Sequence, residues 1–140
     1  VVMDRGHPLF SAQMTVGQFA AYPQIAVSMR EQQPVLINAL LAAQGLERRI
    51  LLTTPYVASL ARTLQGSDML AVVPLRAALS MMDSPWVGYQ ALPLAVQPFS
   101  VCLVWPRNRS ADAGVQWLVG LIQQLESTPA EVLPTPTEVR

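Results

Sequence analysis

The sequence predicts an α/β domain built on a parallel-rich sheet that is flanked by helices. Strand and helix patterns alternate three times between Gln24 and Met82, and their connections are only a few residues long. This alternation predicts right-handed crossovers, because consecutive parallel strands need a crossing segment to return the chain. A length of 140 residues is also enough for one domain with its own core. We therefore expect helices on both faces of one sheet.

Turn and capping residues place the elements in order. Gly6-His7-Pro8 predicts a turn, because Pro8 fixes its own φ and keeps His7 out of the helical region. Thr15 and Gln18 have the spacing of a capping box, which marks a helix start. The predicted elements are a strand over 1–4, a helix over 16–22, a strand over 24–29, a polar loop over 30–33, a helix over 35–44, a strand over 49–53, a helix capped by Thr54 and ended by Gly66, a strand over 69–73, a helix over 75–82, strands over 87–92 and 99–105, and a last helix capped by Asp112.

Three of these segments carry a further expectation. The strand from Arg49 to Thr53 is apolar on both faces, which is typical of a strand buried in a parallel sheet. The last helix has Val115, Ile122 and other apolar residues on one side. Residues 127–140 hold three prolines and three threonines and are predicted to be a disordered tail.

Composition limits the function classes. The nine basic residues are all arginine and balance nine acidic residues, so the net charge of zero argues against a nucleic-acid-binding surface. The longest charge-free stretch, 84–105, contains three prolines that would break a membrane helix. The chain opens without a basic leader, and its single cysteine fits a reducing cytosol. We expect a soluble cytoplasmic protein without a membrane segment.

Charged residues make up only 13% of the chain, about half the roughly 25% of an ordinary soluble domain. Hydrophobic residues reach 51%. A chain so poor in charge is expected to have apolar surface that another part of the protein or a second copy covers. Self-association of this chain is therefore predicted.

No residues in the sequence suggest enzymatic chemistry. It has no phosphate-binding glycine loop, and one histidine with one cysteine cannot form an ordinary zinc site. Cys102 lies in a predicted strand and is expected to be a buried structural thiol. His7 is expected to be a surface turn residue. We predict no enzyme activity, no metal and no cofactor.

Two clusters have a structural and a functional interpretation. Arg48-Arg49 could be an anion site, but without neighbouring aromatic residues a solvated or salt-bridged strand entry is favoured. Met81, Met82 and Trp86 form an apolar group at a helix end. We interpret that group as core or interface and not as a cofactor site.

Polar residues follow two predicted strands at their carboxyl ends, where open parallel sheets bind ligands. Ser28 follows the first internal strand, and Thr54 and Tyr56 follow the next. A ligand carboxylate could accept hydrogen bonds from backbone N–H groups and from the Thr54 hydroxyl, with Tyr56 as an aromatic wall and donor. The residues alone leave an alternative open, in which Thr54 only caps a helix and Tyr56 is a packed ring.

Several segments, taken in order, carry a family resemblance. The segments are Asp4 to Leu9 (a "GHPL" turn), Val27-Ser28, Ala39-Leu40, Gly45 to Ile50 ("GL-x-RR-V"), Ser67 to Arg76 ("SDLLATVP-x-R"), Leu92-Pro93-Leu94, Trp105, and Gln116-Trp117-Leu118. Their order and spacing over 4–125 resemble the effector-binding domain of LysR-type transcriptional regulators, nearest to the nodulation-regulator-like branch. Pro106 and Val119 replace a histidine and an arginine that are usual in that closing region.

The resemblance implies a type II periplasmic-binding-protein fold, with two lobes joined by crossover hinge strands and a small effector between them. It implies that residues 1–126 are the C-terminal part of the effector-binding domain. The distal lobe would occupy about 19–92, and 98–126 would hold the last strand and helix of the proximal lobe. A winged helix-turn-helix outside this chain would carry the DNA contact, and the intact protein would be a homo-oligomer.

The predicted function is therefore ligand sensing by a non-enzymatic domain of such a regulator. The effector would be a small organic acid or aromatic compound, held on the distal side by Ser28, Thr54 and Tyr56. Ser28 matches the family's strand-end position facing the cleft, and Tyr56 stands where the branch often has histidine. The alternative is a solute-binding protein of a transport system, which shares this fold.

Overall fold

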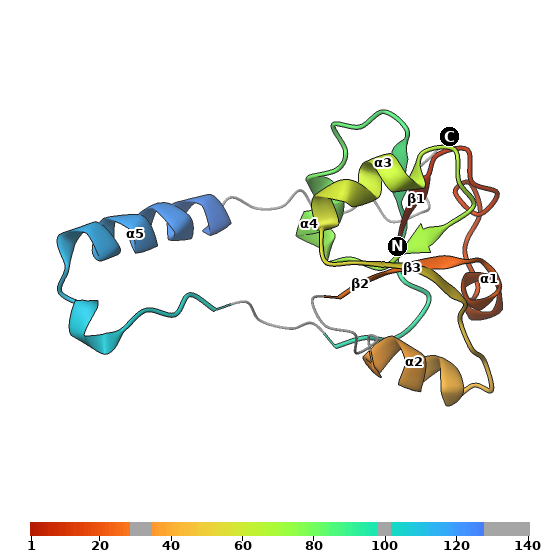
Figure 1. Ribbon diagram of the computed structural model, residues 1–140, viewed down its shortest axis with the longest axis horizontal. Coiled ribbons are helices and arrows are strands. Elements are labelled where there is room, and N and C mark those ends of the chain that lie inside the picture. The colour runs from red at the N-terminus through yellow and green to blue at the C-terminus, as the bar shows by residue number, and fades with distance from the viewer. Residues whose placement is uncertain (29–34, 98–101, 128–140) are drawn as a thin grey trace. The chain divides into compact units, whose positions relative to one another are not determined.

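The computed structural model of the chain describes residues 1–28, 35–97 and 102–127 (Figure 1). The chain divides into two compact units, Val1–Ala95 and Val96–Arg140. The first unit holds a sheet with four helices, and the second holds the last long helix. Each unit is described separately below.

The first unit is organised by a mixed five-stranded sheet in the order β3-β2-β4-β1-β5. The strands are β1 (Val2–Asp4), β2 (Gln24–Val27), β3 (Ile50–Thr54), β4 (Leu70–Ala71) and β5 (Val87–Tyr89). β2 runs parallel to both β3 and β4, which confirms the parallel part of the prediction. β1 lies between β4 and β5 and is antiparallel to both. β2, β3 and β4 therefore all end on the same side of the sheet, which we call its carboxyl edge.

The helices form where capping and turn residues predict them, although several are shorter than expected. They are α1 (Val16–Ala21), α2 (Val35–Ala42), α3 (Leu60–Leu64, after the 3-10 turn Val57–Ser59) and α4 (Leu75–Leu79). The capping box before α1 is complete, since Thr15 and Gln18 bond to each other's backbone N–H groups. Gly45 and Gly66 have φ values of 70° and 66° beyond the ends of α2 and α3, a conformation that favours glycine.

One face of the sheet packs against α3 and α4. Its core cluster consists of buried side chains from four strands and from the helical segments: Val2, Ile25, Leu60, Leu64, Ala71, Ala78, Met81 and Val87. Met82 and Trp86 pack against this cluster, which confirms the core interpretation of the methionine and tryptophan group. The Trp86 indole N–H also donates to the Ala61 carbonyl at 2.8 Å, so the ring is fixed over α3.

β3 does not have the burial predicted for it. Its Leu51 and Leu52 side chains are 56% and 40% exposed. The reason is its position, because β3 is the edge strand next to β2 and no described element lies beyond it. The apolar pattern on both faces of β3 indicated a strand covered on both sides, and the described residues do not supply that cover.

The GHP turn folds inward, so the prediction of a surface His7 is wrong. The ring is only 4% exposed and lies 4.5 Å from the Tyr22 ring, centroid to centroid. His7 Nδ1 accepts from the Leu9 N–H, and His7 Nε2 lies 3.1 Å from the Asp68 carbonyl oxygen. A carbonyl can only accept, so Nε2 carries the hydrogen. His7 thereby links the segment after β1 to the segment before β4.

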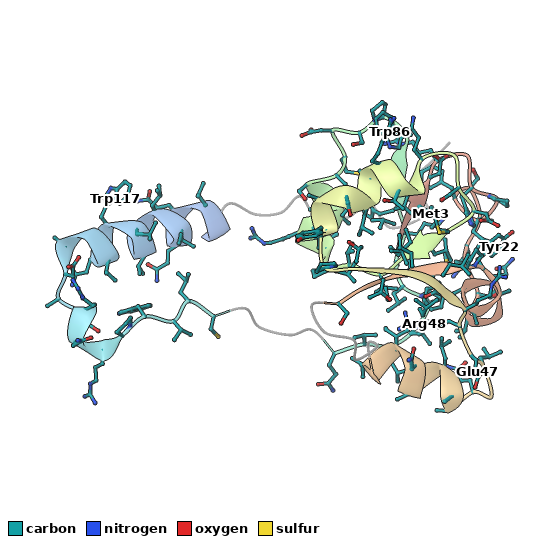
Figure 2. The ribbon with its side chains drawn as sticks, in the orientation of Figure 1. Met3, Tyr22, Glu47, Arg48, Trp86 and Trp117 are labelled. Atoms are coloured by element: carbon teal, nitrogen blue, oxygen red, sulfur yellow. The ribbon has the colours of Figure 1, made fainter. Side chains whose placement is uncertain are left out.

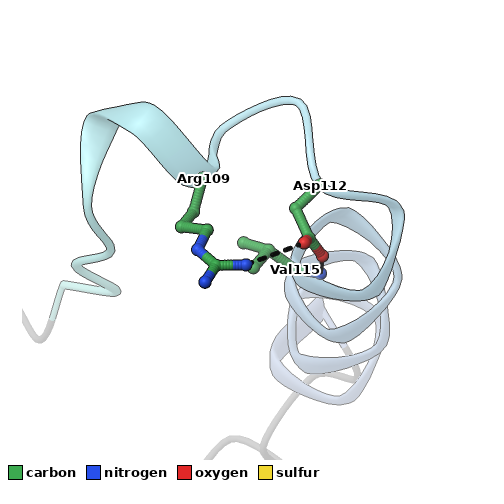
Figure 3. A network of polar contacts seen from close by, with 3 residues as sticks. All are labelled: Arg109, Asp112 and Val115. Carbon is green, nitrogen blue, oxygen red and sulfur yellow. Dashed lines mark hydrogen bonds and ion pairs between the residues drawn. The ribbon is translucent and has the colours of Figure 1, made fainter.

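The second unit contains α5 (Ala113–Ser127), which begins as predicted. The Asp112 carboxylate accepts from the Val115 N–H at 3.1 Å, and Arg109 pairs with the other carboxylate oxygen at 3.4 Å (Figure 3). The strand predicted over 99–105 is wrong for its described part, because 102–105 has no strand pairing. Cys102 is exposed there, so the prediction of a buried thiol is also wrong.

Some predictions lie outside the described residues. These are the polar loop over 30–33, the part of the predicted strand at 99–101, and residues 128–140 of the predicted tail. Ser127, the first residue assigned to that tail, is the last residue of α5.

Candidate functional site

The structure brings Ser28 and Thr54 together at the carboxyl edge of the sheet. Val27 pairs with Thr54 in the parallel ladder between β2 and β3. The Ser28 N–H then donates to the Thr54 carbonyl at 3.1 Å, which continues the ladder by one bond. Two residues that are 26 positions apart in the sequence are therefore direct neighbours, and both are half-buried.

Tyr56 lies two residues beyond Thr54, in a turn that Thr54 organises. The Thr54 hydroxyl oxygen accepts from the Tyr56 N–H at 3.1 Å, a local side-chain turn typical of threonine. Thr54 is the last residue of β3, so the prediction that it caps a helix is wrong. The helical segment starts later, at Val57, and its N-cap residue Tyr56 makes no side-chain capping bond.

The Tyr56 ring is 70% exposed, so it is not the packed ring of the structural alternative. A large exposed aromatic side chain beside strand-end hydroxyls can bury its surface against a ligand. Ser28, Thr54 and Tyr56 each have a hydroxyl group that can both donate and accept hydrogen bonds. The arrangement is suited to binding polar groups and contains no pairing of a nucleophile with a base.

A third strand end belongs to the same edge and was missed in the sequence. β4 lies on the other side of β2 and runs in the same direction, so the segment Val72-Val73-Pro74 that follows β4 lies at this edge too. The signal for it was the third strand-helix alternation. The sequence could not show that β4 is a direct neighbour of β2, because the strand order does not follow the order in the chain.

A separate hollow of about 300 Å³ lies elsewhere in this unit. It is lined by residues of α2 and of the segment before β3: Asn38, Leu41, Ala42, Leu46, Glu47 and Arg48. Arg48 donates to Gln24, at the start of β2, so this hollow is at the opposite end of β2 from Ser28. Ser28, Thr54 and Tyr56 are not among the residues that line this hollow.

Arg48 and Glu47 are labelled in this region in Figure 2, and of the predicted solvated or salt-bridged strand entry the fully solvated form does not apply to Arg48. It is half-buried, and its guanidinium donates to Asn38 Oδ1 at 2.7 Å and to Gln24 Oε1 at 3.2 Å. Burial lowers the pKa of the Arg48 guanidinium from its ordinary value. Arg48 therefore ties α2 to the start of β2, while Arg49 stays exposed.

Neither a metal site nor a membrane span is found in residues 1–28, 35–97 and 102–127. No group of three or more histidine, cysteine, aspartate or glutamate side chains in these ranges could hold a metal ion. Within the same part of the chain, no helix has both the length and the apolar character needed to cross a membrane.

A mixed α/β unit whose parallel strands end together beside polar residues is typical of α/β domains that bind small molecules. The family model described as the LysR substrate binding domain matches residues 1–126. The chain therefore belongs to that family, which confirms the resemblance found in its motifs.

Relatives with names support the same family. The chain is 28% identical over 113 residues to Nodulation protein D 2 of Sinorhizobium fredii, covering 80% of this chain and 36% of the relative. It is 24% identical over 123 residues to the HTH-type transcriptional activator NagR of a Ralstonia species, covering 88% of this chain and 41% of NagR. The chain thus spans less than half the length of these relatives.

Solved structures confirm the fold. The regulatory domain of MexT, a transcriptional activator in Pseudomonas aeruginosa, matches with a TM-score of 0.71 at 23% identity, over 88% of this chain and 58% of that one. A putative transcriptional regulator from Vibrio parahaemolyticus matches with a TM-score of 0.74 at 16% identity, over 88% and 57%. The fold is the type II periplasmic-binding-like fold that the motifs implied.

Proposed function

We propose that this chain is the ligand-sensing part of a LysR-type transcriptional regulator and that it is not an enzyme. A small organic effector, either an organic acid or an aromatic compound, would bind between two lobes and shift their arrangement. The observation that carries the proposal is the family match over residues 1–126, combined with the polar edge where β2 and β3 end. An effector acts on such a domain only through its different affinity for the two arrangements.

Ser28, Thr54 and Tyr56 are the proposed effector contacts on the distal lobe. The bond from the Ser28 N–H to the Thr54 carbonyl makes these two residues backbone neighbours, and the turn at Thr54 places Tyr56 two residues further along the same strand end. An effector that covers the exposed Tyr56 ring would gain apolar burial in addition to hydrogen bonds. The rest of the site would come from the other lobe, most of which is outside this chain.

We propose the lobe boundaries that the motifs suggest. The distal lobe would be about 19–92, β1 would be the first crossover strand, the returning hinge would follow the distal lobe, and 98–126 would belong to the proximal lobe. The division of the chain after Ala95 supports a change of unit between those two segments.

The output of the proposed sensor is DNA binding by a winged helix-turn-helix that is not part of this chain. NagR and MexT are named as transcriptional activators, which favours a regulator over the solute-binding alternative. The neutral charge of this segment fits a division of labour, because a DNA-binding surface needs an excess of cations. The intact regulator is proposed to act in the cytoplasm as a homo-oligomer.

The test uses the intact regulator with its own operator DNA. A panel of small organic acids and aromatic compounds is screened by thermal shift, because a ligand at 100 times its Kd stabilises the bound state by about 2.7 kcal/mol. The proposal expects at least one compound that raises the melting temperature and also changes operator binding or promoter output. A compound that stabilises the protein and leaves DNA binding unchanged, or that is chemically converted, would contradict the regulator function.

A further inference from the structure

The segment that follows β1 returns along the sheet and is fastened to β5. We call residues 9–12 the strap. β1 and β5 pair through Val2 with Tyr89, Met3 with Gly88, and Asp4 with Val87. Beyond this ladder, the Arg5 guanidinium donates from Nε to the Val87 carbonyl at 2.8 Å. The chain therefore leaves β1, turns at residues 5–8 and comes back as the strap beside the strand that β1 already pairs with.

The Gln90 side chain holds the strap. Its amide nitrogen Nε2 donates to the Leu9 carbonyl at 2.9 Å, to the Ala12 carbonyl at 3.0 Å and to the Phe10 carbonyl between them. An amide group has two hydrogens, so three acceptors require one shared hydrogen. The Gln90 backbone N–H donates at the same time to the Val1 carbonyl at 2.8 Å. One residue thus binds the strap with its side chain and the start of β1 with its backbone.

The Phe10 ring provides the apolar part of the same attachment. It lies so close to Gly88 of β5 that a methyl group on Gly88 would come within 2.1 Å of Phe10 Cε2. Only a residue without a side chain allows this approach. The Arg5 guanidinium also lies over this ring, with its central carbon 6.0 Å from the ring centroid. The strap therefore covers β5 with one aromatic ring and one row of carbonyl acceptors.

We propose that Gln90 is a positioning residue that couples β1 to β5, so that the two strands and the strap move as one body. These contacts form a closed loop. β1 continues into the strap, Gln90 binds the strap, and Gln90 directly follows β5, which pairs with β1. A displacement of either strand must then carry the other or break the Gln90 contacts. This inference rests on the proposed function to the extent that β1 is the first crossover strand and β5 belongs to the distal lobe.

The test is hydrogen exchange on the 140-residue chain with the variant Gln90→Glu. This change keeps the shape of the side chain but puts a carboxylate, which can only accept, against three carbonyl oxygens. The proposal expects amides of the strap and of the β1–β5 ladder to exchange about tenfold faster, because losing the contacts makes local opening easier. Amides of the β2–β3 ladder should keep their rates.

Two matched variants and one condition complete the experiment. Gln13→Ala removes an exposed glutamine just past the strap and should leave every rate unchanged. Gln90→Ala removes the donor without adding charge and should give a smaller acceleration in the same two places. Lowering the pH until the introduced carboxylate is protonated should restore part of the protection in Q90E, since a carboxylic acid can donate again.

Faster exchange confined to the strap would overturn the proposed coupling of β1 to β5, because Gln90 would then stabilise only the strap. Unchanged exchange in both Gln90 variants would overturn it as well. No effector is used in this experiment, so its failure leaves the proposed function standing. Conversely, a failed effector screen would leave the coupling of β1 and β5 intact.

Discussion

The two outer strands of the sheet, β5 and β3, differ in how well the described residues cover them. β5, at one edge, has a fully buried Val87, and the strap places the Phe10 ring against its Gly88. β3, at the other edge, exposes Leu51 and Leu52, and nothing in the described part of the chain covers them. Exposed apolar edge strands invite pairing with another chain, and proteins normally blunt them with charge, proline or a covering segment. β3 contains neither charge nor proline.

The difference between β5 and β3 bears on the low content of charged residues in the sequence. The β5 edge is complete within this chain, so its apolar residues stabilise the unit described here. Among the residues that the structure describes, β3 and α5 hold exposed apolar side chains, Trp117 and Leu125 of α5 among them. A chain that spans less than half of its named relatives leaves room for the missing cover. This exposure fits our proposal that another part of the protein or a second copy covers the apolar residues of β3 and α5.

The largest expected effect is the loss of stability when a buried leucine of the sheet is truncated, compared with an exposed one. Leu70 in β4 is fully buried, and Leu51 in β3 is mostly exposed. Leu70→Ala should lower the free energy of unfolding by about 3 kcal/mol, as in other buried leucines, and Leu51→Ala by less than about 0.5 kcal/mol. Urea denaturation of the two variants measures both values. Equal losses would show that β3 is covered in the chain as it stands.

The next effect tests how tightly β5 is covered. Gly88→Ala should cost about 2 kcal/mol, because the new methyl group displaces the Phe10 ring from a packed position. The same change in a Phe10→Ala background should cost much less, since the clashing ring is gone. A double-mutant cycle on the free energy of unfolding measures this difference. Additive costs would mean that Phe10 does not set the requirement for glycine.

A smaller effect concerns the turn that leads from β1 into the strap. The N–H groups of Gly66 and Gly6 donate to the Asp4 carboxylate and hold its pKa below its ordinary value. A lowered pKa means that these bonds stabilise the fold above about pH 4, the range of an unfolded aspartate, and that this stability is lost as the pH falls further. Asp4→Asn should therefore cost about 1 kcal/mol at pH 7.

The measurement is urea denaturation of both proteins from pH 7 down to pH 2.5. The stability difference between wild type and Asp4→Asn should shrink as the pH falls below about 4. A difference that is constant over this range would show that the charge of Asp4 has no part in it. Arg109 offers a control, because its ion pair with Asp112 is exposed and lies in the other unit.

The smallest effect on stability is expected from a charge placed on the open edge. Leu51→Glu should change the free energy of unfolding by less than about 0.5 kcal/mol, because the side chain is already exposed. It should nevertheless reduce self-association, since a charge on an edge strand opposes pairing with a second copy. Light scattering over a range of concentrations compares the variant with wild type. A wild-type chain that stays a compact monomer at high concentration would contradict the predicted self-association.

Local signals in the sequence predicted much of the fold. The capping box at Thr15, the left-handed Gly45 and Gly66, and the Asp112 cap all mark real helix ends, because each depends on residues a few positions apart. The parallel arrangement of β2, β3 and β4 also followed from the strand-helix alternation. These features need no knowledge of distant contacts.

What the sequence did not predict depends on long-range contacts. His7 was expected at the surface. It is buried, and its ring bonds to the carbonyl of Asp68, which is 61 positions away in the sequence. The exposure of β3 depends on its place in the strand order, which the alternation does not reveal. For the candidate site, the sequence predicted that Ser28 and Thr54 share one edge, and the structure adds the direct bond between them. The position of β4 beside β2 and the attachment of the strap to Gln90 both depend on residues far apart in the sequence.

The most direct test of the central claim is the affinity of the intact regulator for an effector found by the thermal-shift screen. Isothermal titration would compare wild type with Tyr56→Ala, using Tyr22→Phe near His7 as a control away from the strand-end site. The account predicts that Tyr56→Ala weakens binding by about tenfold or more, because the ring would be buried against the effector. The control should bind as wild type does. Unchanged affinity in Tyr56→Ala would remove Tyr56 from the site and contradict the strand-end edge as the place where this protein senses its ligand.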